Sequence, residues 1–308
     1  MRISVTDRCN LHCSYCRPQG GKVAEAGELL ALDETLLLCR VAAGLGIRVF
    51  KITGGEPLLR DGCVDFMAQL KKLDGVHEVT LTTNGTLLEQ HLPELAAAGI
   101  RYINLSLDTL DKSHYHALTG GDLDKVVGAI PKALACGMKL KINCVPLQLF
   151  SPEEYCQLVK LTELGIPVRF IELMPLECNG ALKGYSAAEI LKILQEGGYS
   201  LQPLSDGQHF GFGPAKYYRV QGFSAPIGFI EPLHGKFCAQ CNRVRLTATG
   251  QFKTCLYSNE MLDLRNMLRN GASVEALQQA IIEEIAAKPK EHQFCVKAAG
   301  FAMSNIGG

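Results

Sequence analysis

The stretch Arg-Ile-Ser-Val-Thr-Asp-Arg-Cys-Asn-Leu-His-Cys-Ser-Tyr-Cys-Arg, residues 2–17, decides the fold. Its apolar and β-branched start predicts a short buried strand. The strand runs directly into Cys9, Cys13 and Cys16, spaced C-x3-C-x2-C. Structural zinc takes four ligands, and all-cysteine iron–sulfur clusters usually take four thiolates. Three thiolates on one loop therefore indicate a metal centre with one position left for another ligand, although zinc completed by His12 or a distant cysteine is an alternative.

The overall charge limits the partners that the chain can bind. It has 31 basic and 31 acidic residues, so its formal net charge is zero. This balance argues against nucleic acid or a membrane surface as a partner, since both favour a basic excess. No apolar run is long enough to span a membrane, no signal peptide is recognisable, and the chain has thirteen cysteines. These features predict a cytoplasmic protein whose clustered cysteines bind metal.

Strands and helices alternate through the first half of the chain. Such alternation predicts a parallel sheet with right-handed crossovers, and six units are too few for a closed eight-stranded barrel. We therefore predict an α/β fold, an incomplete (β/α)6 TIM-type barrel over residues 1–174. The alternation stops after residue 174, and residues 175–308 should form a C-terminal α+β extension covering the open side. The first of the six predicted strands begins at Ile3. The other five are Val49–Ile52, Val79–Thr82, Tyr102–Leu107, Leu140–Val145 and Val168–Ile171.

Unusual residues cluster where these strands end. In a parallel β/α sheet the chemistry lies at the carboxyl ends of the strands. Gly54-Gly55-Glu56-Pro57 follows the second strand, and its glycines allow the backbone to approach a ligand closely. The other strand-end or strand residues of interest are Asn84, Ser106, Lys141, Glu172 and Met174.

A second set of three cysteines lies in the C-terminal half, at Cys238, Cys241 and Cys255. His234 could complete a zinc site here. Arg243 and Arg245 follow directly and point to the same side of an extended strand. Paired guanidinium groups suit a phosphate-rich ligand, and no P-loop motif is present to hold a nucleotide otherwise.

The first cysteine loop, with Tyr15 just before its third cysteine, resembles the signature of radical S-adenosylmethionine enzymes. The resemblance implies that Cys9, Cys13 and Cys16 hold a [4Fe–4S] cluster, whose fourth iron binds S-adenosylmethionine. It also implies that Gly54, Gly55 and Glu56 hold the methionyl amino group. Tyr15, Ser106 and Met174 match positions that line this cofactor site.

The segment around the second cysteines, together with a Gly-Gly terminus, resembles the GTP 3′,8-cyclase family of molybdenum-cofactor biosynthesis. This likeness covers essentially the whole chain. It implies a second [4Fe–4S] cluster on Cys238, Cys241 and Cys255 that meets the guanine of GTP. The catalytic residues implied are Cys9, Cys13, Cys16, Arg2, Arg243 and Arg245. The GTP-binding residues implied are Arg2, Lys51 (generally arginine in the family), Thr82, Lys141, Arg243, Val244, Arg245, Gly307 and Gly308.

The same resemblance implies the reaction and the partners. The reduced first cluster cleaves S-adenosylmethionine, the 5′-deoxyadenosyl radical takes the hydrogen from C3′ of GTP, and C3′ joins C8 of guanine. A flavodoxin- or ferredoxin-type protein would donate electrons. A companion cyclic pyranopterin monophosphate synthase would use the product, and the chain would be a monomer or homodimer.

Two other functions compete with this interpretation. One is a radical enzyme that modifies a peptide and carries an auxiliary cluster; the arginine pair and the Gly-Gly end argue against it. The other is a non-catalytic protein with two structural zinc sites, for which an open loop at the mouth of a β/α sheet is poorly suited.

Overall fold

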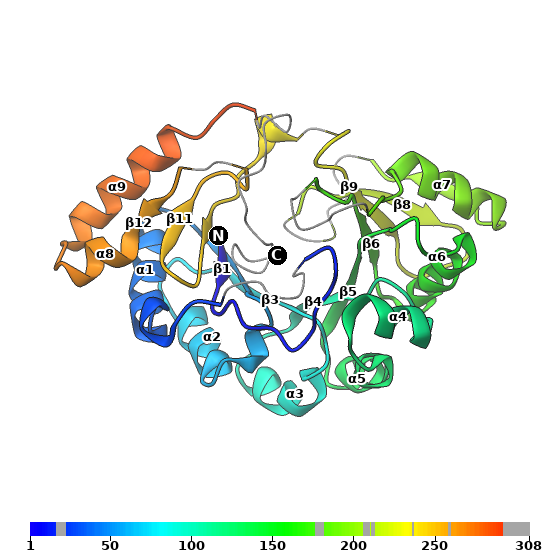
Figure 1. Ribbon diagram of the computed structural model, residues 1–308, viewed down its shortest axis with the longest axis horizontal. Helices are drawn as coiled ribbons and strands as arrows, with labels where there is room; N and C mark the ends of the chain where they lie inside the picture. The colour runs from blue at the N-terminus through cyan, green and yellow to red at the C-terminus, as the bar shows by residue number, and fades with distance from the viewer. Residues whose placement is uncertain are drawn as a thin grey trace.

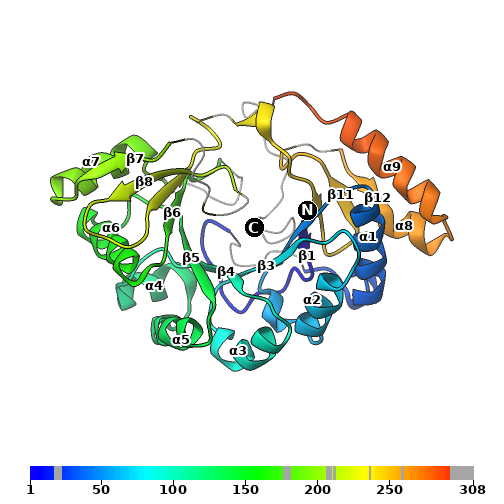
Figure 2. The same cartoon turned by 180° about the vertical axis from the view of Figure 1, so that it is seen from behind.

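The strands of the computed structural model form one curved, open sheet. The structure describes residues 1–16, 23–175, 182–205, 210, 213–235, 237–257 and 260–291. Within these residues the sheet has twelve strands, in the order β12-β11-β10-β1-β2-β3-β4-β5-β6-β9-β8-β7. Figure 1 shows the sheet as an arc with helices along its convex side, and Figure 2 shows the same arc from behind. The sheet does not close, so the predicted class of open, partial barrel is confirmed.

The first six strands are all parallel to their sequence neighbours, as the alternation predicts. They are β1 (Arg2–Ser4), β2 (Val49–Thr53), β3 (Glu78–Thr83), β4 (Tyr102–Ser106), β5 (Lys139–Cys144) and β6 (Val168–Ile171). The helices that return the chain between them are α1 (Leu32–Gly44), α2 (Cys63–Lys71), α3 (Leu88–Ala97), α4 (Lys112–Thr119), α5 (Leu123–Ala135) and α6 (Pro152–Val159).

The C-terminal half continues this sheet at both of its edges. Beside β6 lie β9 (Ile227–Ile230), β8 (Lys216–Val220) and β7 (Leu201–Pro203), and beside β1 lie β10 (Arg245–Leu246), β11 (Gln251–Lys253) and β12 (Leu262–Asp263). Three helices accompany them: α7 (Ala187–Glu196), α8 (Leu264–Arg269) and α9 (Val274–Ala286). The extension thus lengthens the arc at both edges, as Figures 1 and 2 show.

The two faces of the sheet differ in chemistry. Side chains alternate along each strand, so one set faces the helices and the other faces the concave side. The set facing the helices is apolar and forms the main core, with members such as Ile3, Ile52 and Leu81. A second apolar cluster lies under α1, α8 and α9 and includes Leu246, Phe252 and Leu277. Because the apolar residues occupy the convex face, the alternate charged residues on the same strands face the hollow of the arc.

Two helices in the described residues fall outside the strand–helix alternation expected from the sequence. These are α4, whose N-cap Asp111 accepts a hydrogen bond from His114 N, and the short α8. No helix in the described part of the chain is long and apolar enough to cross a membrane.

Candidate active site

The first cysteine loop is held by the ends of three strands and one helix. After β1, Val5 N donates to Thr53 O at 2.9 Å. Further along, His12 N and Ser14 N donate to the last carbonyls of α4, on Thr119 and Leu118. These contacts fix the backbone that carries Cys9, Cys13 and Cys16 at the carboxyl edge of the sheet, where the sequence predicts it.

The segment Gly54-Gly55-Glu56 packs directly on the backbone of this loop. Gly55 N donates to Thr6 O at 2.7 Å, and Glu56 N donates to Arg8 O at 2.8 Å. A Cβ on Gly54 would lie 2.5 Å from Thr6 O, and one on Gly55 would lie 2.2 Å from Arg8 O. Both glycines are therefore required by a backbone-to-backbone contact, which places this segment beside the cysteine loop. Their predicted contact with S-adenosylmethionine stays a prediction.

Glu56 links that segment to the end of β3. Its carboxylate accepts hydrogen bonds from Leu58 N at 3.1 Å, Thr83 Oγ1 at 2.8 Å and Asn84 N at 2.7 Å. Burial raises the pKa of Glu56 to about 7, against the lowering effect of these bonds. The side chain is fully buried, so Glu56 acts here as a brace between two loops.

Polar side chains reach the cysteine loop from two neighbouring strands. From the end of β3, Asn84 Nδ2 donates to Asn10 Oδ1 at 2.9 Å and lies 3.7 Å from the Sγ of Cys9. From the end of β4, Asp108 Oδ2 accepts a hydrogen bond from the Tyr15 hydroxyl at 2.7 Å. Burial raises the pKa of Asp108 to about 6. The Tyr15 hydroxyl is thus used to anchor the loop.

This loop fits an iron–sulfur cluster in the chemistry of its donors. Burial and the neighbouring Cys16, Asp108 and Cys9 raise the pKa of the Cys13 thiol, so thiolates here need a positive partner such as iron. The backbone N–H of Leu11 donates to Cys9 Sγ at 3.4 Å, the type of bond that tunes cluster sulfurs. Among the described residues no three His, Cys, Asp or Glu side chains are grouped to share one metal ion. The thiolates of a cubane cluster each bind a separate iron and do not need to share one.

A row of cations crosses the concave face beneath the loop. Arg2 on β1 is in register with Lys51 on β2 and with Arg245 on β10. Burial lowers the pKa of Lys51, and the charges that lower it further are all cations: Arg2, Arg169, Lys141 and Arg243. Like charges gathered in a low-dielectric hollow repel one another, and a polyanion placed among them would relieve that repulsion.

Two members of this row were not predicted from the sequence. Arg169 on β6 is 5% exposed, and its Nη2 donates to Asn104 Oδ1 and Asn143 Oδ1, both at 2.6 Å. Lys253 on β11 is fully buried opposite Arg245, and burial, with Arg245, lowers its pKa to about 8. The signal for Arg169 is its place between Val168 and Phe170 on a predicted strand, which indicates a side chain facing a polar interior; Lys253, between Phe252 and Thr254, lies outside the predicted strands.

The other predicted residues are placed as follows. Thr82, Asn104 and Lys141 are aligned across β3, β4 and β5, and Ser106 at the end of β4 is aligned with Asn143. Burial lowers the pKa of Lys141 to about 8, with a further contribution from Arg169.

Three predicted contacts need qualification. The side chain of Val244 packs in the apolar cluster on the convex face, and its carbonyl oxygen accepts a hydrogen bond from Arg2 N at 2.9 Å. Its side chain is therefore turned away from the cations. Met174 follows β6, and the described range that contains it ends at residue 175. Gly307 and Gly308 lie outside the described residues.

The second set of cysteines lies where β10 and β11 meet the end of α9. Cys238 begins a 3-10 turn, η5 (Cys238–Gln240), and Cys241 N donates to Cys238 O at 3.0 Å. Burial raises the pKa of the Cys241 thiol, but the Arg243 N–H and the charges of Arg243 and Lys288 outweigh it, so the net pKa is lowered. Burial and the neighbouring Arg243 lower the pKa of Arg245 to about 10, while the Cys241 and Cys255 thiols act in the opposite direction, so this arginine lies between the second thiols and the row of cations.

The loop before Cys238 is held to the end of β6 by Glu172. The Glu172 carboxylate accepts hydrogen bonds from Leu233 N at 2.8 Å and His234 N at 3.4 Å, and it pairs with His234 Nδ1. In this structure one ring nitrogen of His234 is thus already paired, and Glu172 acts as a brace for the loop that leads to the cysteines.

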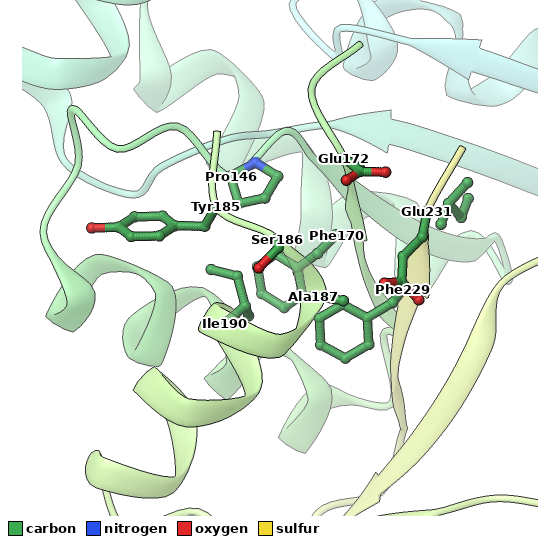
Figure 3. A pocket seen from close by; sticks show the side chains of 10 residues that line it. Pro146, Phe170, Glu172, Tyr185, Ser186, Ala187, Ile190, Phe229 and Glu231 are labelled. Atoms are coloured by element: carbon green, nitrogen blue, oxygen red, sulfur yellow. The ribbon is translucent and has the colours of Figure 1, made fainter. Parts of the chain in front are cut away.

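A shallow hollow beside α7 is a separate feature. Figure 3 shows its lining, in which the rings of Phe170 and Phe229 are stacked and Glu172 and Glu231 lie at one side. Phe170 follows Arg169 on β6 and so faces the opposite side of the sheet. The carboxylates of this hollow would repel the phosphates of a nucleotide, and no lysine or arginine lines it, so the concave face is the candidate site.

Comparison with known proteins agrees with this geometry. A model of the radical SAM superfamily matches residues 3–162, and a model described as Molybdenum Cofactor Synthesis C matches residues 166–294. The crystal structure of Streptococcus suis SuiB bound to S-adenosylmethionine superposes with a TM-score of 0.64 at 18% identity. The superposition covers 90% of this chain and 67% of the SuiB chain. The chain belongs to the radical SAM superfamily, whose members are enzymes that use S-adenosylmethionine and an iron–sulfur cluster.

Whole-length relatives narrow the family further. GTP 3′,8-cyclase of Clostridium perfringens (strain 13 / Type A) is 40% identical over 301 residues, covering 96% of this chain and 92% of the relative. GTP 3′,8-cyclase of Heliobacterium modesticaldum is 41% identical over 320 residues, covering 100% of this chain and 97% of the relative. Within the superfamily, the chain belongs to the GTP 3′,8-cyclase family.

Proposed function

We propose that this protein cyclises GTP to (8S)-3′,8-cyclo-7,8-dihydroguanosine 5′-triphosphate, the first step of molybdenum-cofactor biosynthesis. The observation that carries the proposal is the row of cations between the two sets of cysteines. Arg2, Lys51 and Arg245 are in register on neighbouring strands, and Arg169 and Lys141 extend the row toward β6. A triphosphate is a ligand with enough negative charge to offset several such groups.

The two sets of cysteines, one on each side of the row of cations, have separate roles in the proposal. Cys9, Cys13 and Cys16 would hold the first [4Fe–4S] cluster, with S-adenosylmethionine beside Gly55, Ser106 and Met174. When bound, the cluster and S-adenosylmethionine would supply the one-electron chemistry for removing the hydrogen atom from C3′ of GTP. Cys238, Cys241 and Cys255 would hold a second [4Fe–4S] cluster facing the guanine.

The protein itself contributes position, charge and shelter. Glu56, Asn84 and Asp108 fix the first cysteine loop, so the reacting atoms are held in one geometry. Cationic side chains that are already desolvated need little reorganisation to bind phosphate. A buried site also keeps water away from the reacting atoms. We further propose a cytoplasmic enzyme with a flavodoxin- or ferredoxin-type electron donor and a companion synthase that uses the product.

The test is product formation by anaerobically reconstituted protein with dithionite, S-adenosylmethionine and either GTP or ATP. We expect a new isomer of GTP in the mass-resolved chromatogram and no such product from ATP. Cleavage of S-adenosylmethionine without any new nucleotide would overturn the GTP assignment and favour a peptide substrate. Protein that binds zinc and no acid-labile sulfide would overturn the enzymatic proposal.

A further inference from the structure

Lys288 contacts the second cysteine loop with its ammonium group. Its Nζ donates to Cys241 O at 2.7 Å and to Arg243 O at 3.0 Å, and it lies 3.5 Å from the Sγ of Cys241. A lysine ammonium carries three hydrogens. All three therefore have an acceptor, and every acceptor belongs to the segment Cys241–Arg243.

The position of Lys288 is fixed by the helix before it. Lys288 is the second residue after α9, following the C-cap Ala287, and its own N–H donates to Ile285 O at 3.2 Å. Two residues of α9, Leu277 and Ile281, are buried against the apolar cluster under β10 and β11. The ammonium is thus delivered to the cysteine loop by an element packed on the same strands that carry Arg245 and Lys253.

We propose that Lys288 is a positioning residue for the second iron–sulfur cluster, holding the Cys241 loop and raising the reduction potential of the cluster through its charge. This inference rests on the proposed second cluster. A reduced cluster carries one more negative charge than an oxidised one, and hydrogen bonds and charge at the sulfurs set cluster potentials. A fixed ammonium near a ligating sulfur therefore stabilises the reduced form more than the oxidised form.

A lysine at a helix C-terminus ordinarily binds the last carbonyls of its own helix, where it also complements the helix dipole. Here the side chain instead reaches 47 residues back in the sequence to Cys241. Lys290, two residues further on, is exposed. It provides a matched control, because its replacement removes the same charge close by.

The experiment is a redox titration of the second cluster alone, followed by electron paramagnetic resonance. The first cluster is removed with Cys9→Ala, Cys13→Ala and Cys16→Ala in the full chain, and Lys288→Met, Lys288→Arg and Lys290→Met are then compared. We expect Lys288→Met to shift the equilibrium between oxidised and reduced cluster about tenfold toward the oxidised form, which is about 59 mV for one electron. Lys288→Arg and Lys290→Met should keep the original potential.

Each outcome decides the inference. A potential unchanged in Lys288→Met with a full cluster would overturn it, as would an equal shift in Lys290→Met. If Lys288→Met does not retain a cluster, Lys288→Gln, which keeps amide donors without the charge, replaces it in the same comparison. If the triple cysteine variant that keeps Lys288 binds no iron, both the second cluster and this inference are overturned. If that variant holds the cluster and Lys288→Met leaves its potential unaltered, the inference alone is overturned.

Discussion

Replacing Lys51 by methionine should have opposite effects on the stability of the protein and on its affinity for GTP. Lys51 is in register with Arg2, and burial together with Arg2 and three further cations lowers its pKa. Charges on neighbouring strands lie about 5–8 Å apart, and at an effective dielectric constant near 20 each pair costs about 2–3 kcal/mol before screening. We expect the nucleotide-free variant to be about 1 kcal/mol more stable after screening by salt and water.

The loss of binding follows from the same charge. A hydrogen bond to a charged group contributes about 1.5–3 kcal/mol, so GTP should bind the variant about 10- to 100-fold more weakly. The change in stability is measured as the thermal unfolding midpoint without nucleotide. The change in GTP affinity is measured by titration calorimetry under anaerobic conditions.

Lys139→Met is the matched control. Lys139 is on β5, two residues before Lys141, but it is exposed and its Nζ lies 4.9 Å from the ring centre of Tyr102. Its replacement should leave GTP affinity unchanged. The account of the concave face would be refuted if Lys51→Met lowered the unfolding midpoint or bound GTP as tightly as the original protein.

Three further predictions concern the cysteine loops and pH. Gly55→Ala should abolish retention of the first cluster, measured as iron per chain, because its Cβ would lie 2.2 Å from Arg8 O; Gly27→Ala, with no atom within 4 Å, should retain it. Cys255→Ala should lower the iron content from about eight to about four per chain, since a [4Fe–4S] cluster needs its thiolates; an unchanged iron content would argue against the second cluster. GTP affinity should fall as the pH rises through about 8, where Lys141 loses its proton. Above about pH 8 the unfolded chain binds more protons than the folded chain, so the stability of the nucleotide-free protein should rise between about pH 8 and 10.5. Lys141→Arg should remove the fall in GTP affinity. A pH profile of affinity that is unaltered in Lys141→Arg would show that another group titrates.

The partial barrel could be predicted because its pattern is local. Each strand from β1 to β6 is followed by a helix with a buried apolar face, and a parallel sheet is the arrangement that such units form. In the C-terminal half, β10 and β12 have only two residues each, and β10 pairs with β1 from the start of the chain. The pairing of Ile3 with Leu246 joins the first and last quarters of the chain, and neither two-residue β10 nor β12 carries a periodic signal.

The site could be predicted to a similar extent. Cysteine spacing singled out the two cysteine loops, and the strand-end rule placed Glu56 and Asn84 beside the first. What they do could not be derived, because it depends on contacts such as the three hydrogen bonds that make Glu56 a brace. Arg169 and Lys253 were missed because a single charge in a strand is as compatible with an exposed face as with a polar interior until the register is known.

The most direct test of the proposed reaction uses GTP deuterated at C3′. Anaerobically reconstituted protein is given dithionite, S-adenosylmethionine and the labelled nucleotide, and the 5′-deoxyadenosine released is examined by mass spectrometry. The account predicts deuterium in that 5′-deoxyadenosine. Unlabelled 5′-deoxyadenosine, formed at the same rate without GTP, would contradict it.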